Sequence, residues 1–341
     1  MKRSKFLTSA AAAVVAAPLL SSFTKTEIGA LPKILPRKLT AGGLVALTAP
    51  SGCIWIKEVM PKMEGILAEL GLKTVTGKTC YEQSGYLAGD DDLRSSELMN
   101  FFEDKSVSAI LTMRGGWGCS RILDKLDYDI IAKNPKIILG FSDITSLLNA
   151  IYLKTGMITY HGPCGYSSWG DFTKQHVTKV LVGGEPYTLK NAVDLDLSLT
   201  PKSFTPGKAQ GALIGGNLTV IASMIGTRYE PDWNGKILFL EDIEEEPYSI
   251  DRMLWQLKQA DVFEKISGVV LGAFTDCIPE EPEKSFTLEE VLDQHFLDAG
   301  FPVYGGAAIG HLAPKFTVPI GIKAEVDADK HSLRLLEQTV S

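Results

Sequence analysis

Short apolar runs that end in a glycine-rich or polar turn and lead into an amphipathic stretch recur along this chain, and they constrain its fold more than any other feature. The apolar runs of the first half lie at residues 43–49, 73–75, 109–113 and 136–140. Stretches with apolar residues at helical spacing lie at residues 59–70, 91–104, 120–126 and 144–153. Such strand, turn and helix units predict a parallel sheet with helices on both faces.

The pattern weakens between residues 186 and 210 and then resumes. Apolar runs at residues 236–240, 268–274 and 302–310 alternate with helical stretches at residues 251–258 and 288–297, and residues 321–336 alternate like antiparallel strands. A chain of 341 residues is long enough for two domains that each bury a core. We predict an α/β fold with a Rossmann or flavodoxin-like N-terminal domain at residues 36–185, a linker at residues 186–210 and a smaller mixed α/β domain at residues 211–338.

The first 24 residues have the pattern of a secretory signal peptide. Lys2, Arg3 and Lys5 precede an apolar run at residues 10–20, and small polar residues follow it. Pro18 interrupts this run, which is shorter than the roughly 20 apolar residues that span a bilayer, so we expect no permanent membrane anchor. We expect an exported, periplasmic protein.

Charge and motif content exclude several classes of function. The chain has 34 basic and 41 acidic residues, a net charge of −7, which becomes −10 without the three basic residues of the signal segment. Because no basic field gathers phosphates, nucleic acid is not an expected partner. The sequence has no GxGxxG, GxxxxGK[ST], HExxH or CxxC motif, so we expect no nucleotide cofactor and no metal site. The five cysteines are interpreted mainly as small buried residues, with a nucleophilic Cys119 as the alternative.

Three side chains follow directly after predicted strands and together form a set for nucleophilic catalysis. Ser142 follows residues 136–140, Glu241 follows residues 236–240, and His311 follows residues 302–310. In an open parallel sheet, ligands bind outside the carboxyl ends of the strands. The three residues supply a hydroxyl, a carboxylate and an imidazole, which can act as nucleophile, orienting acid and general base.

The run GFSDI at residues 140–144 connects a predicted strand directly to a predicted helix, and this is half of a nucleophile elbow. Ile144 replaces the second glycine of the GxSxG motif. The same residues also suit a helix cap through Ser142 or Asp143. On the residues alone, both interpretations remain open.

The glycine-rich run RGGWG at residues 114–118 follows a neighbouring predicted strand. It can aim a backbone N–H at a developing oxyanion, with the Asp143 N–H as the second donor, or it can be only a tight turn. His161 is the main alternative to His311 as the base, and a lone histidine after a strand is often structural. Residues 242–246 are typical of a solvated acidic run, whereas Glu241 emerges directly from a buried strand.

These residues belong to a longer set of motifs that resembles a known family. RGGWG at residues 114–118, LDYD at 126–129, GFSDIT at 140–145 and HGP at 161–163 resemble the N-terminal domain of the LD-carboxypeptidases, serine peptidase family S66. GGNL at residues 215–218, LFLEDI at 238–243, GH at 310–311 and PIG at 319–321 resemble its C-terminal domain. The resemblance runs in order from about residue 36 to residue 329.

The resemblance implies that Ser142 is the nucleophile, His311 the general base and Glu241 its orienting partner, with an oxyanion hole from the backbone N–H groups of Gly116 and Asp143. It also implies a homodimer. The microcin C-cleaving branch of the family shares this catalytic set, so the set alone does not fix the substrate. Trp117 and Phe141 stand where members often carry Tyr, and Trp117 is a candidate for substrate selection.

From the resemblance and the signal segment we expect a periplasmic LD-carboxypeptidase that releases the terminal D-Ala of a murein peptide. A cation is needed for the terminal carboxylate of that substrate, and Arg114 is our candidate. Two alternatives stay open: a serine amidase of the microcin C-cleaving type acting on another peptide conjugate, and a non-catalytic protein that binds wall peptides. Export favours murein because microcin C acts in the cytoplasm.

Overall fold

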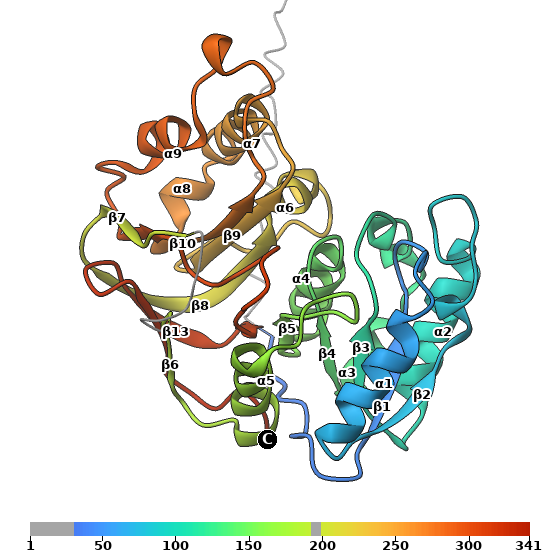
Figure 1. Cartoon of the computed structure of the whole chain (residues 1–341). Coiled ribbons are helices and arrows are strands. Elements are labelled where there is room, and N and C mark those ends of the chain that lie inside the picture. Colours follow the sequence, from blue (N-terminus) through green and yellow to red (C-terminus); the bar gives the residue numbers. More distant parts are fainter. Residues whose placement is uncertain (1–30, 192–198) are drawn as a thin grey trace, which may run out of the picture. The chain divides into compact units, whose positions relative to one another are not determined.

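The computed structural model describes residues 31–191 and 199–341. The predicted signal segment at residues 1–24 and part of the predicted linker at residues 186–210 lie outside these ranges. Residues Pro32–Ser341 form one compact unit, in which helices flank two β-sheets (Figure 1). The α/β fold class predicted from the sequence is confirmed.

The first sheet is built mainly from the N-terminal half of the chain. In spatial order its strands are β12 (Val318–Ile320), β5 (Thr159–His161), β4 (Ile137–Gly140), β3 (Val107–Thr112), β1 (Leu44–Thr48) and β2 (Lys73–Thr76). Neighbours from β5 to β2 pair in parallel, and the continuous apolar sequence of β4 is buried along its whole length, as expected inside a parallel sheet. The edge strand β12 pairs antiparallel with β5, although the sequence pattern assigns it to the second domain.

The second sheet is mixed. In spatial order its strands are β6 (Thr188–Leu189), β14 (Ser332–Leu335), β13 (Lys323–Asp327), β8 (Lys208–Asn217), β9 (Ile237–Ile243), β10 (Gly268–Thr275), β11 (Val303–Gly305) and β7 (Lys202–Thr205). The central strands β8 to β11 pair in parallel, and the outer strands pair antiparallel. The antiparallel strands predicted at residues 321–336 are β13 and β14.

Helices connect the strands of both sheets. They are α1 (Val59–Glu69), α2 (Asp91–Glu103), α3 (Tyr128–Lys133), α4 (Ile144–Thr155), α5 (Asp171–Thr178), α6 (Leu218–Met224), α7 (Pro247–Gln259), α8 (Val262–Lys265) and α9 (Leu288–Phe296). Several begin at a residue whose side chain caps the first turn. The Asp90 carboxylate accepts from the Leu93 N–H at α2, and Thr287 and Glu290 form a capping box at α9. None of the helices in the described ranges is long and apolar enough to cross a membrane.

The two sheets meet at α4, the helix that follows β4. Asn149 Nδ2 donates to the Gly215 carbonyl at 2.9 Å, and Thr145 Oγ1 accepts from the Asn217 N–H at 3.1 Å. A Cβ on Gly216, whose φ is +141°, would lie 2.4 Å from Thr145 Oγ1. Only glycine permits this approach, which holds the carboxyl end of β8 against the helix that begins after β4.

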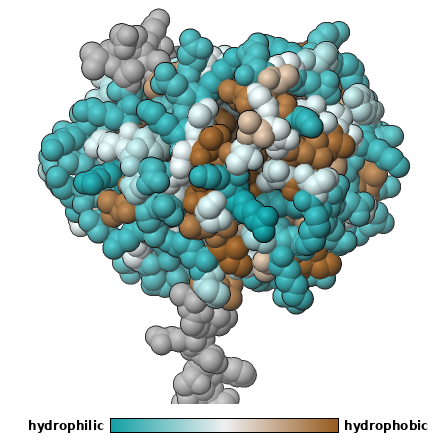
Figure 2. Space-filling model, turned by 90° about the horizontal axis from the view of Figure 1, so that it is seen from below, coloured by the Kyte–Doolittle hydropathy of each residue, from teal (hydrophilic) through white to brown (hydrophobic). Residues whose placement is uncertain are grey.

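Apolar side chains fill the interior of both sheets, and Leu47, Ile110 and Phe239 are completely buried. On the face shown in Figure 2, apolar side chains gather toward the centre and hydrophilic side chains surround them.

All five cysteines are buried free thiols. Burial raises the pKa of Cys119 well above its ordinary value, so this thiol is a poor source of the reactive thiolate.

Three predicted segments differ from the structure. The predicted linker at residues 186–210 contains β6, β7 and the beginning of β8, which pair within the second sheet. The helix predicted at residues 120–126 is replaced by two 3₁₀ turns, Cys119–Arg121 and Leu123–Lys125, and the next α-helix begins only after Asp127, whose side chain caps it. The strand predicted at residues 302–310 ends at Gly305. Gly306 follows with φ +80°, and an irregular segment continues to His311.

Candidate active site

Ser142 lies on the sharp turn between β4 and α4, and its backbone has an unusual conformation. Its φ is +64°, in the left-handed region that residues other than glycine seldom adopt. Its neighbours Phe141 and Asp143 are buried, whereas Ser142 is half-buried. A strained strand-to-helix turn of this kind presents a side chain at the edge of the sheet, as in a nucleophile elbow.

α4 begins without a side-chain cap, although its N-cap residue is Asp143. The Asp143 carboxylate instead accepts hydrogen bonds from Ser51 Oγ at 2.5 Å and from the Cys119 N–H at 2.8 Å. Burial raises the pKa of Asp143, and these two hydrogen bonds act in the opposite direction. The alternative in which the Asp143 side chain caps the helix is therefore wrong.

Glu241 and His311 are hydrogen bonded at the carboxyl edge of the second sheet. Glu241 lies near the end of β9 and is completely buried, whereas the His311 side chain, after β11, is 16% exposed. Glu241 Oε2 lies 2.7 Å from His311 Nδ1. A Cβ on Gly310 would lie 2.5 Å from Glu241 Oε2, so this glycine, with φ +108°, permits the contact.

Burial alone raises the pKa of the Glu241 carboxyl, but the hydrogen bond and charge of His311 outweigh it and hold the pKa below its usual value. Glu241 is therefore a carboxylate at neutral pH. A carboxylate at Nδ1 favours the imidazole tautomer that carries its proton there. That tautomer leaves Nε2 free to accept a proton.

Phe141 brings the two sheet edges together. Its ring centroid lies 4.7 Å from that of His311, and Phe141 directly precedes Ser142 in the chain. The residue before Ser142 thus contacts His311, which is hydrogen bonded to Glu241. Within the described residues, Ser142 Oγ and His311 are not hydrogen bonded, and such bonds often tighten only when substrate is bound.

The segment at residues 113–118, here called the β3 loop, lies against Ser142. A Cβ on Gly115 would lie 2.9 Å from Ser142 Oγ and 3.2 Å from the Asp143 backbone nitrogen. Gly116 comes next in the loop and has φ +101°. The segments that carry both predicted oxyanion donors, Gly116 and Asp143, therefore lie beside the Ser142 hydroxyl.

Trp117 and Arg114, the two predicted substrate-binding residues, are both on the β3 loop. Trp117 is 50% exposed and packs edge to face against Tyr86, with ring centroids 5.7 Å apart. Arg114 Nη1 donates to the Cys53 carbonyl at 2.6 Å, and its guanidinium lies 5.8 Å from the ring centroid of Tyr166. The Arg114 side chain is thus positioned by the protein but keeps further donors.

His161, the alternative base, is buried inside the molecule. Its ring packs edge to face against those of Phe141 and Phe239, with centroid distances of 6.1 Å and 5.2 Å. Burial lowers the pKa of this imidazole to about 4, so the ring is neutral at ordinary pH. Because His311 is partly exposed and paired with Glu241, it is better placed than His161 to exchange protons with a ligand.

Three polar residues near the site were not indicated by the sequence pattern. Ser51 and Arg94 bind the loops beside Ser142. Lys315 is 3% exposed, and its ammonium lies 4.0 Å from the ring centroid of Phe141. Burial lowers the pKa of Lys315. Only its position four residues after His311 hints at a place near the site.

The chemistry available at this site is nucleophilic substitution at a carbonyl. It combines a half-buried hydroxyl on a strained turn, an imidazole bonded to a carboxylate and a glycine-rich loop beside the hydroxyl. Among residues 31–191 and 199–341, no group of three or more His, Cys, Asp or Glu side chains is arranged to hold a metal ion.

Comparisons with known proteins show the family to which this chain belongs. The sequence matches the LD-carboxypeptidase N-terminal domain of peptidase family S66 over residues 45–162 and the C-terminal domain over residues 210–326. It is 40% identical to the "Probable murein peptide carboxypeptidase" of Bacillus subtilis, over 86% of this chain and 91% of that protein. It is 31% identical to the murein tetrapeptide carboxypeptidase of Pseudomonas aeruginosa, over 84% of this chain and 94% of that protein.

Among solved structures, the fold is similar to MccF in complex with glutamyl sulfamoyl guanosine. The TM-score is 0.82 and the identity 28%, over 90% of this chain and 99% of that chain. The two matched family domains together span well over half of the sequence. The chain therefore belongs to the LD-carboxypeptidase family of peptidases, S66.

Proposed function

We propose that this protein is a serine-type LD-carboxypeptidase that releases the terminal D-Ala from a murein tetrapeptide. The observation that carries the proposal is the turn at Ser142, where φ is +64° and the β3 loop lies beside the hydroxyl. The Phe141 ring, one residue away, contacts the ring of His311. The names of the relatives from B. subtilis and P. aeruginosa, which specify murein peptides, support the substrate class.

In this mechanism His311 takes the proton of the Ser142 hydroxyl as Oγ attacks the carbonyl carbon of the diamino acid. The N–H groups of Gly116 and Asp143 stabilise the resulting oxyanion, and Glu241 stabilises the imidazolium. The bond to the D-Ala nitrogen then breaks, and His311 gives its proton to the leaving amine. Water, activated by His311, hydrolyses the ester on Ser142 and regenerates the hydroxyl.

The leaving D-Ala carries a carboxylate, which a nearby cation can bind. Arg114 is the first candidate because it lies on the β3 loop and has donors left after bonding to Cys53. Lys315 is the second candidate because its buried ammonium has only a long contact to an oxygen in the described chain, 3.5 Å to Ser167 Oγ. Replacing the residue that binds the carboxylate by Met is expected to raise KM more than it lowers kcat.

We also propose that the protein is exported to the periplasm. The support is the basic start and apolar run within residues 1–24. In that compartment the enzyme would meet murein peptides directly.

The likeness to MccF supports a second candidate, a serine amidase that acts on another peptide conjugate. MccF has been solved with glutamyl sulfamoyl guanosine, and its structure covers nearly the same length of chain. The same nucleophile, base and oxyanion donors would serve this reaction. The two candidates therefore differ in the pocket and not in the catalytic residues.

The test is mass spectrometry of the tetrapeptide L-Ala-D-Glu-diaminopimelate-D-Ala after incubation with the protein lacking residues 1–24 and with its Ser142→Ala variant. The expected result is D-Ala release by the wild type alone. If neither protein releases D-Ala but the wild type cleaves an aminoacyl nucleoside conjugate, the amidase is correct. Binding of the tetrapeptide without turnover of any amide would indicate a wall-peptide binding protein.

A further inference from the structure

We propose that Arg94 is a positioning residue that holds the oxyanion-hole backbone in place by tying the β3 loop to the loop after β1. The loop after β1, residues 49–52, is called the β1 loop below. This inference rests on the proposed serine mechanism, because it concerns the backbone N–H groups beside Ser142.

Arg94 is a charged side chain with no contact to solvent. It lies on α2 and is 0% exposed. A buried guanidinium is unfavourable unless its charge and donors are satisfied, and an apolar residue of similar volume often serves a core better. Nε of Arg94 has no hydrogen-bond partner in the described residues, so the bonds of its two terminal nitrogens, and not the volume that it fills, explain its place in the fold.

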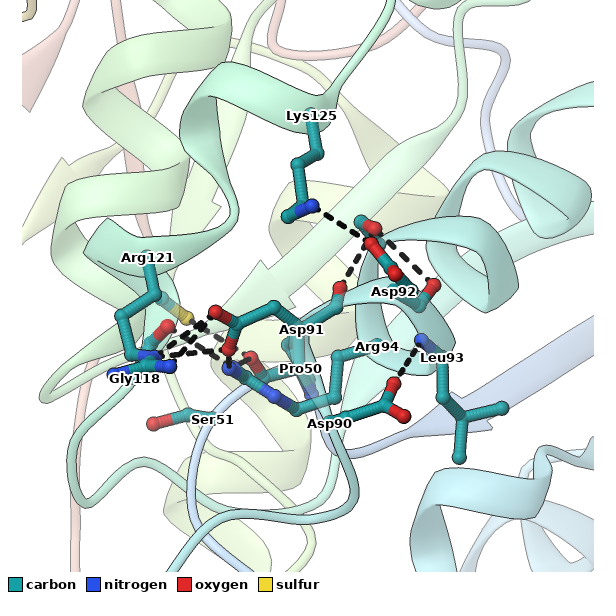
Figure 3. A network of polar contacts seen from close by, with 12 residues as sticks. Pro50, Ser51, Asp90, Asp91, Asp92, Leu93, Arg94, Gly118, Arg121 and Lys125 are labelled. Atoms are coloured by element: carbon teal, nitrogen blue, oxygen red, sulfur yellow. Dashed lines mark hydrogen bonds and ion pairs between the residues drawn. The ribbon is translucent and has the colours of Figure 1, made fainter.

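One guanidinium nitrogen of Arg94 joins the two loops. Nη1 donates to the Pro50 carbonyl at 2.6 Å and to the Gly118 carbonyl at 2.9 Å (Figure 3). Pro50 belongs to the β1 loop, and Gly118 is the last residue of the β3 loop. The second terminal nitrogen, Nη2, bonds to Asp91, whose carboxylate is also held by Arg121 at 2.8 Å.

The backbone conformation of Gly118 and its lack of a side chain permit the contact with Arg94. Its φ is +138°, and a Cβ at this position would lie 2.9 Å from Arg94 Nη1 and 2.6 Å from Leu87 Cδ2. Such a backbone conformation is rarely adopted by residues with a side chain. The end of the β3 loop thus has an unusual conformation that the guanidinium stabilises.

Asp143 joins the same two loops from the side of Ser142. Its Oδ2 accepts from Ser51 Oγ in the β1 loop and from the N–H of Cys119, directly after the β3 loop. The loops are also joined by a backbone bond, in which the Gly52 N–H donates to the Gly115 carbonyl at 3.0 Å.

The β3 loop is therefore fastened near both ends, and Gly116 lies between the fastened points. An oxyanion hole works only if its donors are held at hydrogen-bond distance from the position that the oxyanion will occupy. Without Arg94, the carbonyls of Pro50 and Gly118 lose their shared donor, and the end of the loop is free to relax. The Gly116 N–H would then move, while the pairing of Glu241 with His311 stays intact.

The primary test compares Arg94→Met with Lys125→Met. Lys125 also links α2 to the segment after the β3 loop, through an ion pair with Asp92 at 2.7 Å, but it is 41% exposed. We expect Arg94→Met to lower kcat for D-Ala release about 10²-fold, with KM within about twofold of the wild type. The reason is that the displaced Gly116 N–H would bind the oxyanion only in the transition state. Lys125→Met should keep both constants. A folded Arg94→Met protein with wild-type kcat, or one in which only KM changes, would overturn the proposal.

A second readout does not depend on the murein substrate. A fluorophosphonate probe phosphonylates an activated serine with loss of fluoride, and its phosphoryl oxygen, which gains negative charge in the transition state, would bind the same donors. We expect Arg94→Met to slow labelling of Ser142 by a factor similar to its effect on kcat, even if the tetrapeptide proves to be the wrong substrate. Rapid labelling at equal rates in wild type and variant would refute the positioning role alone, and a wild type unlabelled at Ser142 would refute the serine mechanism as well.

Ser51→Ala weakens the connection between the same two loops by a smaller change. It tests whether this connection matters for catalysis if Arg94→Met does not fold. It removes one hydrogen bond to Asp143 and leaves the buried guanidinium in place. We expect kcat and the labelling rate to fall about 3- to 10-fold at constant KM, the effect of one hydrogen bond. Wild-type rates in folded Ser51→Ala would show that the loops need no such fastening.

Discussion

The first turns of α4 and α9 begin with similar residues and use them differently. At α9, Thr287 Oγ1 accepts from the Glu290 N–H at 3.2 Å, and Glu290 Oε2 accepts from the Thr287 N–H at 2.8 Å. At α4, Asp143 caps nothing with its side chain, and Ser142 before it has a φ of +64°. The turn before α4, which carries the candidate nucleophile, thus has a strained residue and no side-chain cap. The turn before α9, which carries no candidate site residue, is fully capped.

The largest effect expected from this difference concerns activity. Ser142→Ala should lower kcat for amide hydrolysis about 10⁶-fold, because no other group in the site can form the ester. D-Ala release measured by mass spectrometry checks this expectation. The matched change at the capped turn, Thr287→Ala, should leave kcat unchanged, and comparable losses in both variants would contradict the contrast between the turns.

Replacing the carboxylate that orients His311 should have the next largest effect. Glu241→Gln is expected to lower kcat about 10⁴-fold, since an amide can favour the wrong imidazole tautomer and does not stabilise the imidazolium. Glu264→Gln, an exposed change on α8, serves as control. A Glu241→Gln enzyme with nearly full kcat would mean that His311 works without this partner.

Stability near the Ser142 turn should depend on pH through His161. The pKa of this imidazole is about 4 in the folded protein and about 6.5 when exposed. As pH falls from 6.5 to 4, the unfolded chain gains a proton that the folded protein does not bind, so stability is lost over this window, by up to about 3 kcal/mol. Denaturant unfolding at pH 7 and pH 4.5 should show a smaller loss in His161→Met than in the wild type. Equal losses would show that His161 is not the group responsible.

The smallest effect expected is on stability at the two turns themselves. Ser142→Gly should be about 1 kcal/mol more stable than Ser142→Ala, because glycine adopts the left-handed conformation without strain. Thr287→Ala should be about 1 kcal/mol less stable than the wild type, because it loses a cap. Urea unfolding measures both differences. Ser142→Gly and Ser142→Ala of equal stability would remove the evidence for strain at the elbow.

The sequence indicates the proposed catalytic set because two of its members directly follow or end apolar strands. The predicted runs at residues 136–140 and 236–240 correspond to β4 and β9, so periodicity alone places Ser142 and Glu241 at or near strand ends. The strand before His311 is shorter than predicted and ends at Gly305. The pairing of His311 with Glu241 depends on an irregular segment and on Gly310, which periodicity does not describe.

Other features depend on contacts between distant residues and could not be predicted. Ser142 and Asp143 are good capping residues, and only the positions of Ser51 and Cys119 show why Asp143 does not cap α4. Arg94 bonds to backbone carbonyls 44 and 24 residues away, and a carbonyl leaves no signature in the sequence. The place of β12 in the first sheet likewise depends on backbone pairing with the distant strand β5, which side-chain periodicity does not predict.

The central claim is that Ser142 is acylated by the murein peptide during turnover, and rapid-quench mass spectrometry of the protein with the tetrapeptide tests it most directly. Acylation predicts an adduct with the mass of the tetrapeptide less D-alanine, mapped to the peptide that contains Ser142 and absent from Ser142→Ala. D-Ala release at the wild-type rate by Ser142→Ala, with no adduct on the wild type, would contradict the claim.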